Sequence, residues 1–343
     1  MGSRVYLDWN ATAPLRGEAR AAMIAAMDVV GNPSSVHAEG RAARALVERA
    51  RAQVAAAVGC KPAEVVFTSG ATEAAAVLGR LPVARVEVDP TAHDCLWSQR
   101  RDGEGSRAIG WGYANNETGV IAEPSAREDG APLMLDIVQA VGKVPFSFAW
   151  SGAEMAVVSA HKFGGPKGIG ALILRDGVEV TPALTGGGQE MGRRAGTENI
   201  IGIAGMGAAA EAAARDLADG VWDEVAELRN ILESALSSVA NNTISVGNDM
   251  PRLPNTLCLI APGWKGETQV MAMDLAGYAI SAGSACSSGK VRPSRVLLAM
   301  GHDEAQAAQA IRVSLGPGVT KEEVLRFADV WSAQYRKALS RAA

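Results

Sequence analysis

The sequence is poor in several features that point to particular classes of protein. It has four cysteines in 343 residues, and none forms a CxxC pair, so neither a zinc site nor a disulfide framework is expected. It has no Lys/Arg run with interleaved aromatic residues, and its formal net charge is −4. No charged start is followed by an apolar stretch, and no apolar run is long enough to cross a bilayer. These absences favour a soluble, cytoplasmic protein with no metal, no membrane contact and no direct nucleic-acid partner.

What is present is a large apolar fraction with regular alternation. Hydrophobic residues make up 48% of the chain, enough for a large core. Strand-like and helix-like segments alternate over residues 16–245, which predicts a mostly parallel sheet covered by helices. After residue 250, prolines and glycines separate short strands, and two helices follow. The sequence predicts an α/β domain over 16–248 and a smaller α+β domain over 1–15 and 249–343.

Helix ends are also suggested by local patterns. A helix is predicted over 35–58, with Ser34 or Ser35 as its N-cap. The Ala-rich stretch 201–239 predicts one or two further helices.

One segment delivers a lysine into a glycine-rich turn. It reads Ser159-Ala-His-Lys162-Phe-Gly-Gly-Pro-Lys-Gly-Ile-Gly170 and follows an apolar strand. A lysine there can be desolvated and have its pKa lowered, as a Schiff-base lysine requires. A surface lysine in a hairpin is the alternative, and it suits Lys167 better than Lys162.

A second turn has features of an anion site. In Thr68-Ser-Gly-Ala-Thr72, a strand ends and a helix begins. Free backbone N–H groups, the helix dipole and the Thr72 hydroxyl suit a single phosphate monoester. The P-loop pattern GxxxxGK[ST] is absent from the sequence. Many turns of this kind bind nothing, so the motif is weak by itself.

Three polar residues lie near predicted strands. Asp136 ends one, where ligands of parallel sheets bind, and could keep a pyridine nitrogen protonated; a helix N-cap is the alternative. His93 follows another strand and could stack on a ring, shuttle a proton or form a loop hydrogen bond. Arg312 lies between apolar residues, where a bidentate carboxylate contact would satisfy it.

Cys286 differs from the other cysteines in its surroundings. It lies in the Ser/Gly-rich segment 281–289, a composition typical of flexible linkers that leaves a thiol uncrowded. A nucleophile that meets a substrate and then passes its cargo to another protein benefits from that setting. A small buried side chain is the alternative, and it fits Cys60, Cys95 and Cys258 better.

Taken together, these motifs resemble the cysteine desulfurases of the class V aminotransferase group, which are fold-type I enzymes of pyridoxal 5′-phosphate (PLP). The Ser/Gly-rich segment resembles the mobile-loop type of that family. The resemblance covers most of the chain. The matching segments are residues 6–14, 31–35, 68–73, 114–119, 136–139, 159–162, 186–190, 194–197, 281–286 and 311–316.

The resemblance implies a role for each site residue. Lys162 would carry PLP as a Schiff base, Asp136 would pair with the pyridinium nitrogen, and His93 would stack on the ring. Gln139 and Asn116 would lie near the phenolic oxygen. The implied phosphate contacts are Ala71, Thr72, Ser159 and His161, with Thr197 reaching the phosphate of the partner subunit in a homodimer.

The resemblance also implies the reaction. Asn32 and Arg312 would bind the carboxylate of L-cysteine, and Lys162 would remove its Cα proton. Cys286 would take the sulfur as a persulfide, and L-alanine would leave. The sulfur would pass to an iron–sulfur scaffold or another acceptor protein, for cluster assembly or tRNA thiolation.

One departure from the family concerns the stretch 73–115. Thr72 and Asn116 are 44 positions apart, and the family normally fits more strand and helix there. A βαβ unit needs about 30 residues, and His93 must be placed in the same span. One strand and its crossover are therefore expected to be missing or reduced.

Two kinds of alternative function remain open. One is another enzyme of the same fold, either a selenocysteine lyase or a transaminase for a small amino acid. The other is an inactive homologue that acts as a binding partner in sulfur transfer, which the shortened stretch favours. Cys286 in its Gly/Ser setting favours desulfuration over transamination.

Overall fold

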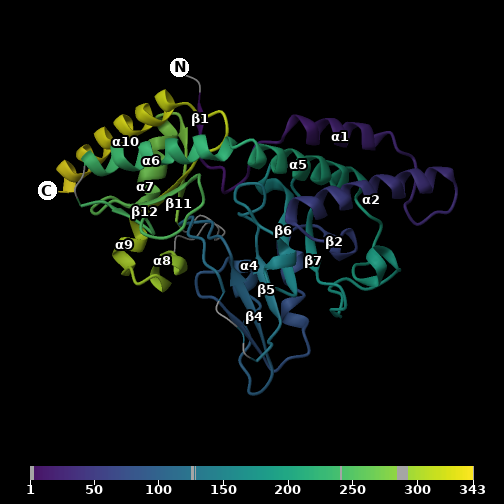
Figure 1. Cartoon of the computed structure of the whole chain (residues 1–343). Helices are drawn as coiled ribbons and strands as arrows, with labels where there is room; N and C mark the ends of the chain where they lie inside the picture. Colours follow the sequence, from purple (N-terminus) through teal and green to yellow (C-terminus); the bar gives the residue numbers. More distant parts are fainter. Residues whose placement is uncertain (1–3, 125–126, 128, 240–241, 284–292, 343) are drawn as a thin grey trace. The chain divides into compact units, whose positions relative to one another are not determined.

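The computed structural model of the chain describes residues 4–124, 127, 129–239, 242–283 and 293–342 (Figure 1). Cys286 lies outside these residues. The chain divides into two compact units: a large unit, residues 12–113 and 123–219, and a small unit, residues 1–11, 114–122 and 220–343.

The large unit contains a six-stranded sheet in the order β2-β7-β6-β5-β4-β3. Its strands are β2 (Val65–Thr68), β3 (Arg85–Val88), β4 (Arg107–Gly112), β5 (Leu133–Asp136), β6 (Met155–Ser159) and β7 (Gly170–Leu174). β3, β4, β5 and β6 are parallel, whereas β7 is antiparallel to both β6 and β2. The predicted mostly parallel α/β sheet is confirmed. β7 reverses because the connection from β6, residues 160–169, is too short for a helical crossover.

Three long helices of the large unit pack together: α1 (Gly17–Met27), α2 (Ala38–Val58) and α5 (Ile200–Ala218). α5 lies close to α2 at Gly207, where the absence of a side chain permits the approach. A Cβ added to Gly207 would lie 2.7 Å from Ala50 Cα. The predicted N-cap of α2 needs correction. His37 caps the helix, with its Nδ1 accepting the Gly40 N–H at 3.4 Å, because the helix starts at Ala38 rather than at Ser35.

The crossover from β3 to β4 is short. Its helix, α4 (Asp94–Trp97), has four residues. α4 and the helix that follows β2, α3 (Ala71–Ala75), share a core with one face of the sheet. β3 is the edge strand, and its outer side meets an isolated antiparallel bridge from Val86 to Arg101. This agrees with the reduced crossover expected for the stretch 73–115.

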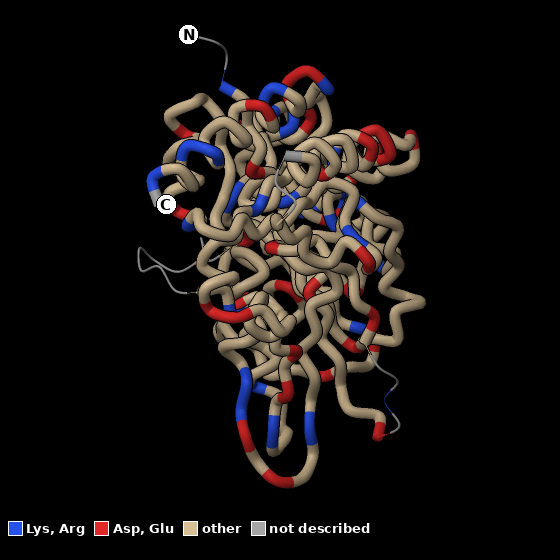
Figure 2. Tube along the Cα trace, turned by 90° about the vertical axis from the view of Figure 1, so that its left-hand side faces the viewer, with Lys and Arg blue, Asp and Glu red and all other residues tan. Residues whose placement is uncertain are grey.

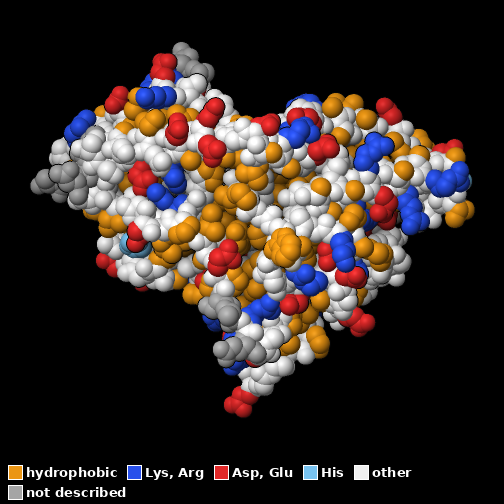
Figure 3. All heavy atoms as spheres, viewed as in Figure 1, with side chains coloured by type: hydrophobic (Ala, Val, Ile, Leu, Met, Phe, Trp, Pro, Cys, Tyr) orange, Lys and Arg blue, Asp and Glu red, His pale blue; other side chains and the backbone are white. Residues whose placement is uncertain are grey.

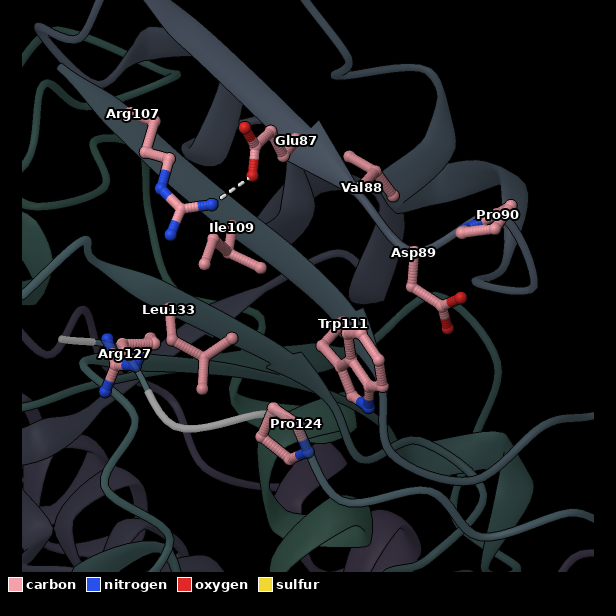
Figure 4. Close-up of a pocket in the computed structure, with 10 residues that line it drawn as sticks. All are labelled: Glu87, Val88, Asp89, Pro90, Arg107, Ile109, Trp111, Pro124, Arg127 and Leu133. Atoms are coloured by element: carbon pink, nitrogen blue, oxygen red, sulfur yellow. Dashed lines mark hydrogen bonds and ion pairs between the residues drawn. The ribbon is translucent and has the colours of Figure 1, made fainter. Parts of the chain in front are cut away.

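The opposite face of β3, β4 and β5 is partly open (Figure 4). A groove of about 300 Å³ lies on it, with Ile109, Trp111 and Leu133 along its floor and an ion pair between Arg107 and Glu87 at its side. No helix occurs in the described residues between β4 and β5. This part of the sheet therefore lacks the helical cover that parallel sheets usually have on both faces.

The small unit is built on an antiparallel sheet in the order β11-β12-β9-β8, with a parallel pair β1-β10. The strands are β1 (Val5–Tyr6), β8 (Ile244–Ser245), β9 (Thr256–Ile260), β10 (Tyr278–Ala279), β11 (Ser281–Ala282) and β12 (Ala310–Ser314). The helices are α6 (Val221–Val239), α7 (Gly266–Leu275), α8 (Arg295–Ala299), α9 (Glu304–Ala308) and α10 (Lys321–Ala342). Because α6 packs on β9 and α10, the unit boundary falls near residue 220 rather than at the predicted 248.

An aromatic cluster stabilises the small unit. The rings of Trp331 and Tyr335 stack with centroids 5.0 Å apart, and Trp264 lies 5.8 Å from Trp331. The buried Trp331 Nε1–H donates to Gln269 Oε1 at 3.0 Å, which removes the cost of burying the indole N–H.

Charged residues of both signs are interspersed along the chain. Figure 2 shows Lys and Arg close to Asp and Glu in many places, and the face drawn in Figure 3 carries both signs side by side. Among the described residues, no helix is both long and apolar enough to span a membrane.

Candidate active site

Several of the predicted residues converge on the carboxyl ends of the parallel strands in the large unit. Asp136 ends β5, and Ser159 ends β6. Lys162 lies in the 3₁₀ turn that directly follows β6, and His93 precedes the first residue of α4, beyond β3. Because the carboxyl ends of parallel strands share one edge of a sheet, these side chains lie where α/β proteins bind ligands.

Asp136 is a buried carboxylate at this edge, with 7% of its surface exposed. Its Oδ1 accepts the Val138 N–H at 3.0 Å, and Cys95 Sγ lies 3.8 Å from its Oδ2. Burial raises the pKa of Asp136, against the opposing effects of His93, Val138 N–H and Lys162. No ion pair within 4.0 Å of Asp136 occurs among the described residues, so a cationic ring N–H is a chemically suitable partner.

Lys162 and His161 lie in a setting of concentrated positive charge. Burial, followed by Lys162, Lys167 and Lys143, lowers the pKa of His161 to about 4. The imidazole is therefore neutral at pH 7 and can contribute a hydrogen bond but not a charge. Its Nδ1 lies 3.2 Å from Thr12 Oγ1. Lys162 is half-buried, whereas Lys167 is exposed, as expected from the sequence.

The turn before α3 lies beside the end of β6. In the sheet register, Gly170 of β7 pairs with Thr68 on one side and with Ser159 on the other. A Cβ added to Gly170 would lie 2.7 Å from Gly70 Cα, so a glycine is needed for this approach. The amides at the start of α3 have no acceptor within the helix. This register brings the start of α3, with Ala71 and Thr72, close to the end of β6 at Ser159.

The 186–197 segment is anchored by a buried ion pair. Arg51 Nη1 and Nη2 each lie 2.8 Å from a carboxylate oxygen of Glu190, and Phe67 N–H donates to Glu190 Oε2 at 2.8 Å. Thr197, at the end of this segment, is exposed.

Arg312 lies in the small unit and is already held by protein groups. Its Nη2 contacts Asp8 Oδ1 at 2.7 Å, and its Nη1 donates to the carbonyl of Asn116 at 3.1 Å. The residue is 4% exposed, and its buried Nε–H has no partner among the described residues. An unpaired guanidinium donor is suited to an incoming carboxylate.

Asn32 is placed differently from the other predicted residues. It is exposed in the loop between α1 and α2, and its Oδ1 accepts the Ser34 N–H at 2.9 Å. Among the described residues, no hydrogen bond or ion pair joins Asn32 to another predicted site residue. Its assignment to the substrate carboxylate stays a prediction.

The three described cysteines are poor candidates for the nucleophile. Burial raises the pKa of Cys60 and of Cys258 to about 12 in each case. It also raises the pKa of Cys95, which lies against Asp136. Because the thiolate is the reactive form, these side chains fit the structural role expected for them. Cys286 lies outside the described residues.

Sequence reasoning missed three partners of the predicted residues: Asp8 at Arg312, Cys95 at Asp136, and Lys143 at Gln139. Lys143 Nζ donates to Gln139 Oε1 at 2.6 Å, and both side chains are buried. The pattern Gln-x-x-x-Lys, with the lysine following a glycine, was the available signal for this last pair.

Comparison with known proteins agrees with this geometry. The model of the aminotransferase class-V family matches residues 5–83 and 104–327. The interruption, residues 84–103, contains β3 and α4. A cysteine desulfurase from Klebsiella pneumoniae is 40% identical over 359 residues, covering 94% of this chain and 90% of that protein. An IscS-like cysteine desulfurase from Mycobacterium tuberculosis is 36% identical, covering 91% of each chain.

Solved structures give the same result. A NifS-like protein superposes with a TM-score of 0.86 and 30% identity, covering 97% of this chain and 100% of that one. A structure described as SspA in complex with cysteine superposes with a TM-score of 0.75 and 26% identity, covering 91% of this chain and 99% of that one.

The sheet, its ligand-binding edge and the family match define a class-V aminotransferase fold, fold-type I among PLP enzymes. Within that class, three relatives that are 37–40% identical and cover 94–95% of this chain are cysteine desulfurases. The chain belongs to the cysteine desulfurase family.

Proposed function

We propose that this member of the cysteine desulfurase family binds PLP through Lys162 and converts L-cysteine to L-alanine, with the sulfur retained on Cys286. The observation that carries the proposal is Asp136. Its carboxylate is buried, has a raised pKa and forms no ion pair among the described residues. It lies at the same edge of the sheet as Lys162 and the turn before α3. This combination suits the pyridinium ring of a phosphorylated cofactor.

PLP would supply an electron-withdrawing ring that accepts charge from the substrate carbon. The protein supplies the groups around it. Asp136 keeps the ring nitrogen protonated, and neutral His161, Ser159 and Thr72 donate hydrogen bonds to the phosphate. His93 would contact the ring, and Gln139 and Asn116 would supply polar groups for its phenolic oxygen. Lys162 Nζ accepts the proton from the substrate Cα.

Sulfur transfer is assigned to Cys286 because desolvation raises the thiol pKa of each described cysteine. Its thiolate attacks the substrate sulfur, and an S–S bond forms as the substrate Cβ–S bond breaks. The electron pair of the broken bond stays on the substrate carbons; Cβ takes up one proton, and Cα regains the proton held by Lys162, which gives alanine. The persulfide then passes to an iron–sulfur scaffold or another acceptor protein.

A homodimer is part of the proposal. Thr197 is exposed on the large unit, as a residue serving the partner's phosphate would be. Large apolar side chains are exposed on and after α1, with Ile24 57%, Met27 59% and Val30 81% exposed, and Figure 3 shows hydrophobic side chains over this helix. A second copy of the chain would remove this apolar surface from water.

The products of the reaction test the function. Purified protein with PLP, L-cysteine and a thiol reductant is expected to show visible absorbance and to release alanine and sulfide in equal amounts. A transaminase would form a keto acid in place of alanine, and a selenocysteine lyase would accept selenocysteine but not cysteine. A protein that takes up no PLP would contradict the proposal.

Arg312 gives a test of substrate binding. In Arg312→Gln, kcat/KM for L-cysteine is expected to fall about 10²-fold, because a charge-assisted contact with the carboxylate is lost. Cysteamine, which lacks the carboxylate, serves as the matched substrate and should react equally with both proteins. An equal fall for both substrates would show that Arg312 acts through the fold, by way of its Asp8 contact.

A further inference from the structure

Lys143 is a buried lysine for which the proposed reaction has no use. It is 2% exposed and lies in the turn that follows β5, the strand that carries Asp136. Burying an ammonium group is costly unless polar groups compensate it. The turn is close to α5 just before Lys143: Gly142 has a φ of 70°, and a Cβ added to it would lie 2.5 Å from Ala213 Cβ.

The contact of Lys143 with Gln139 has a defined polarity. Its Nζ donates to Gln139 Oε1 at 2.6 Å, and Gln139 is 3% exposed. An ammonium group has three donors and no acceptor, so it must face the amide oxygen and not the amide nitrogen. The Gln139 N–H groups then point away from Lys143. An amide without such a partner can present either end to its other neighbours.

We propose that Lys143 is a positioning residue of the cofactor site, whose ammonium fixes the Gln139 amide so that its N–H groups face the phenolic oxygen of PLP. The proposal rests on the proposed function, since it takes PLP as the ligand. A phenolic oxygen carries negative charge and accepts hydrogen bonds. A reversed amide would place its carbonyl oxygen against that charge, which is repulsive.

Lys143 and Lys167 both contribute positive charge near His161. Only Lys143 has a hydrogen bond to Gln139, so the effect proposed for Lys143 acts through that amide.

The test is a double-mutant cycle read by cofactor affinity. Lys143→Met keeps the length of the side chain and removes its charge and its donors. Its Kd for PLP, measured on the apoprotein by absorbance and fluorescence, is expected to rise about tenfold, the loss of one oriented hydrogen bond. In a Gln139→Ala background, the same substitution should change Kd by less than about twofold, because Lys143 acts through Gln139.

Lys167→Met is the matched control. Lys167 also contributes charge near His161, but it is exposed and does not contact Gln139. It should leave the Kd for PLP unchanged. A pH titration of the visible absorbance gives an independent reading. Its midpoint is expected to move upward further in Lys143→Met than in Lys167→Met, because both substitutions remove a nearby positive charge but only Lys143 also orients the Gln139 amide.

The results distinguish a failure of this proposal from a failure of the proposed function. An unchanged Kd in Lys143→Met, or an equal loss in the presence and absence of the Gln139 side chain, would overturn it. If the wild-type chain itself bound no PLP, the proposed function would fail instead. If Lys143→Met did not fold, as judged by circular dichroism, Lys143→Gln would replace it in the same cycle, and the same two results would decide.

Discussion

Lys162→Ala is expected to abolish the visible absorbance of the bound cofactor and to lower sulfide release by about 10²- to 10⁴-fold or more, the range for loss of a general base. The same amine is proposed to hold PLP and to accept the Cα proton, so both effects should appear together. Absorbance spectra with and without borohydride, and a sulfide assay with L-cysteine, measure them.

Lys167→Ala is the control for this prediction. It removes a lysine from the same glycine-rich turn, but that lysine is exposed. Spectrum and sulfide release should both match the wild-type protein. A Lys162→Ala protein with an unchanged spectrum would contradict the assignment of the cofactor lysine. A variant that lost absorbance but released sulfide at the normal rate would contradict its role as the base.

Cys286→Ala is expected to retain PLP and its absorbance and to lose sulfide release from L-cysteine in the presence of a reductant. The persulfide has no other suitable carrier among the described cysteines, because desolvation raises the pKa of each of their thiols. The loss should reach the background of the assay. Mass spectrometry should detect one additional sulfur atom on the wild-type chain after cysteine is added, and none on the variant.

Cys60→Ala is the matched control for Cys286, since Cys60 is the least buried of the described cysteines. It should release sulfide normally and still gain a sulfur atom. Normal sulfide release by Cys286→Ala would rule out the persulfide role and would reopen transamination or direct elimination as the reaction.

The sequence predicted those parts of the site that are encoded by short contiguous motifs. Three such motifs are the turn at Lys162, the strand end at Asp136 and the turn before Thr72. Each follows an apolar strand, and the end of a strand determines where the next side chains lie. The N-cap of α2 was wrong. Both serines had the chemistry of a cap, but the helix begins three residues later, where His37 accepts the N–H.

The boundary between the units was also beyond the reach of the sequence. α5 is Ala-rich and α6 is not, but only Asp219 and Gly220 separate the two helices, so the sequence shows no linker at the boundary between the units. Only packing distinguishes them: α5 lies against α1 and α2, whereas α6 lies against β9 and α10. A pattern of apolar residues shows that a helix buries one face, but not against which partner.

The sequence by itself determined the family, the mostly parallel sheet and the residues expected to carry the chemistry, because local motifs and strand periodicity are properties of adjacent residues. The tertiary structure decided which groups act on those residues. Asp8 meets Arg312 across 304 positions of sequence, and Cys95 meets Asp136 across 41. Lys143 is close to Gln139 in sequence, but its effect depends on burial, and burial is set by the packing of the whole large unit.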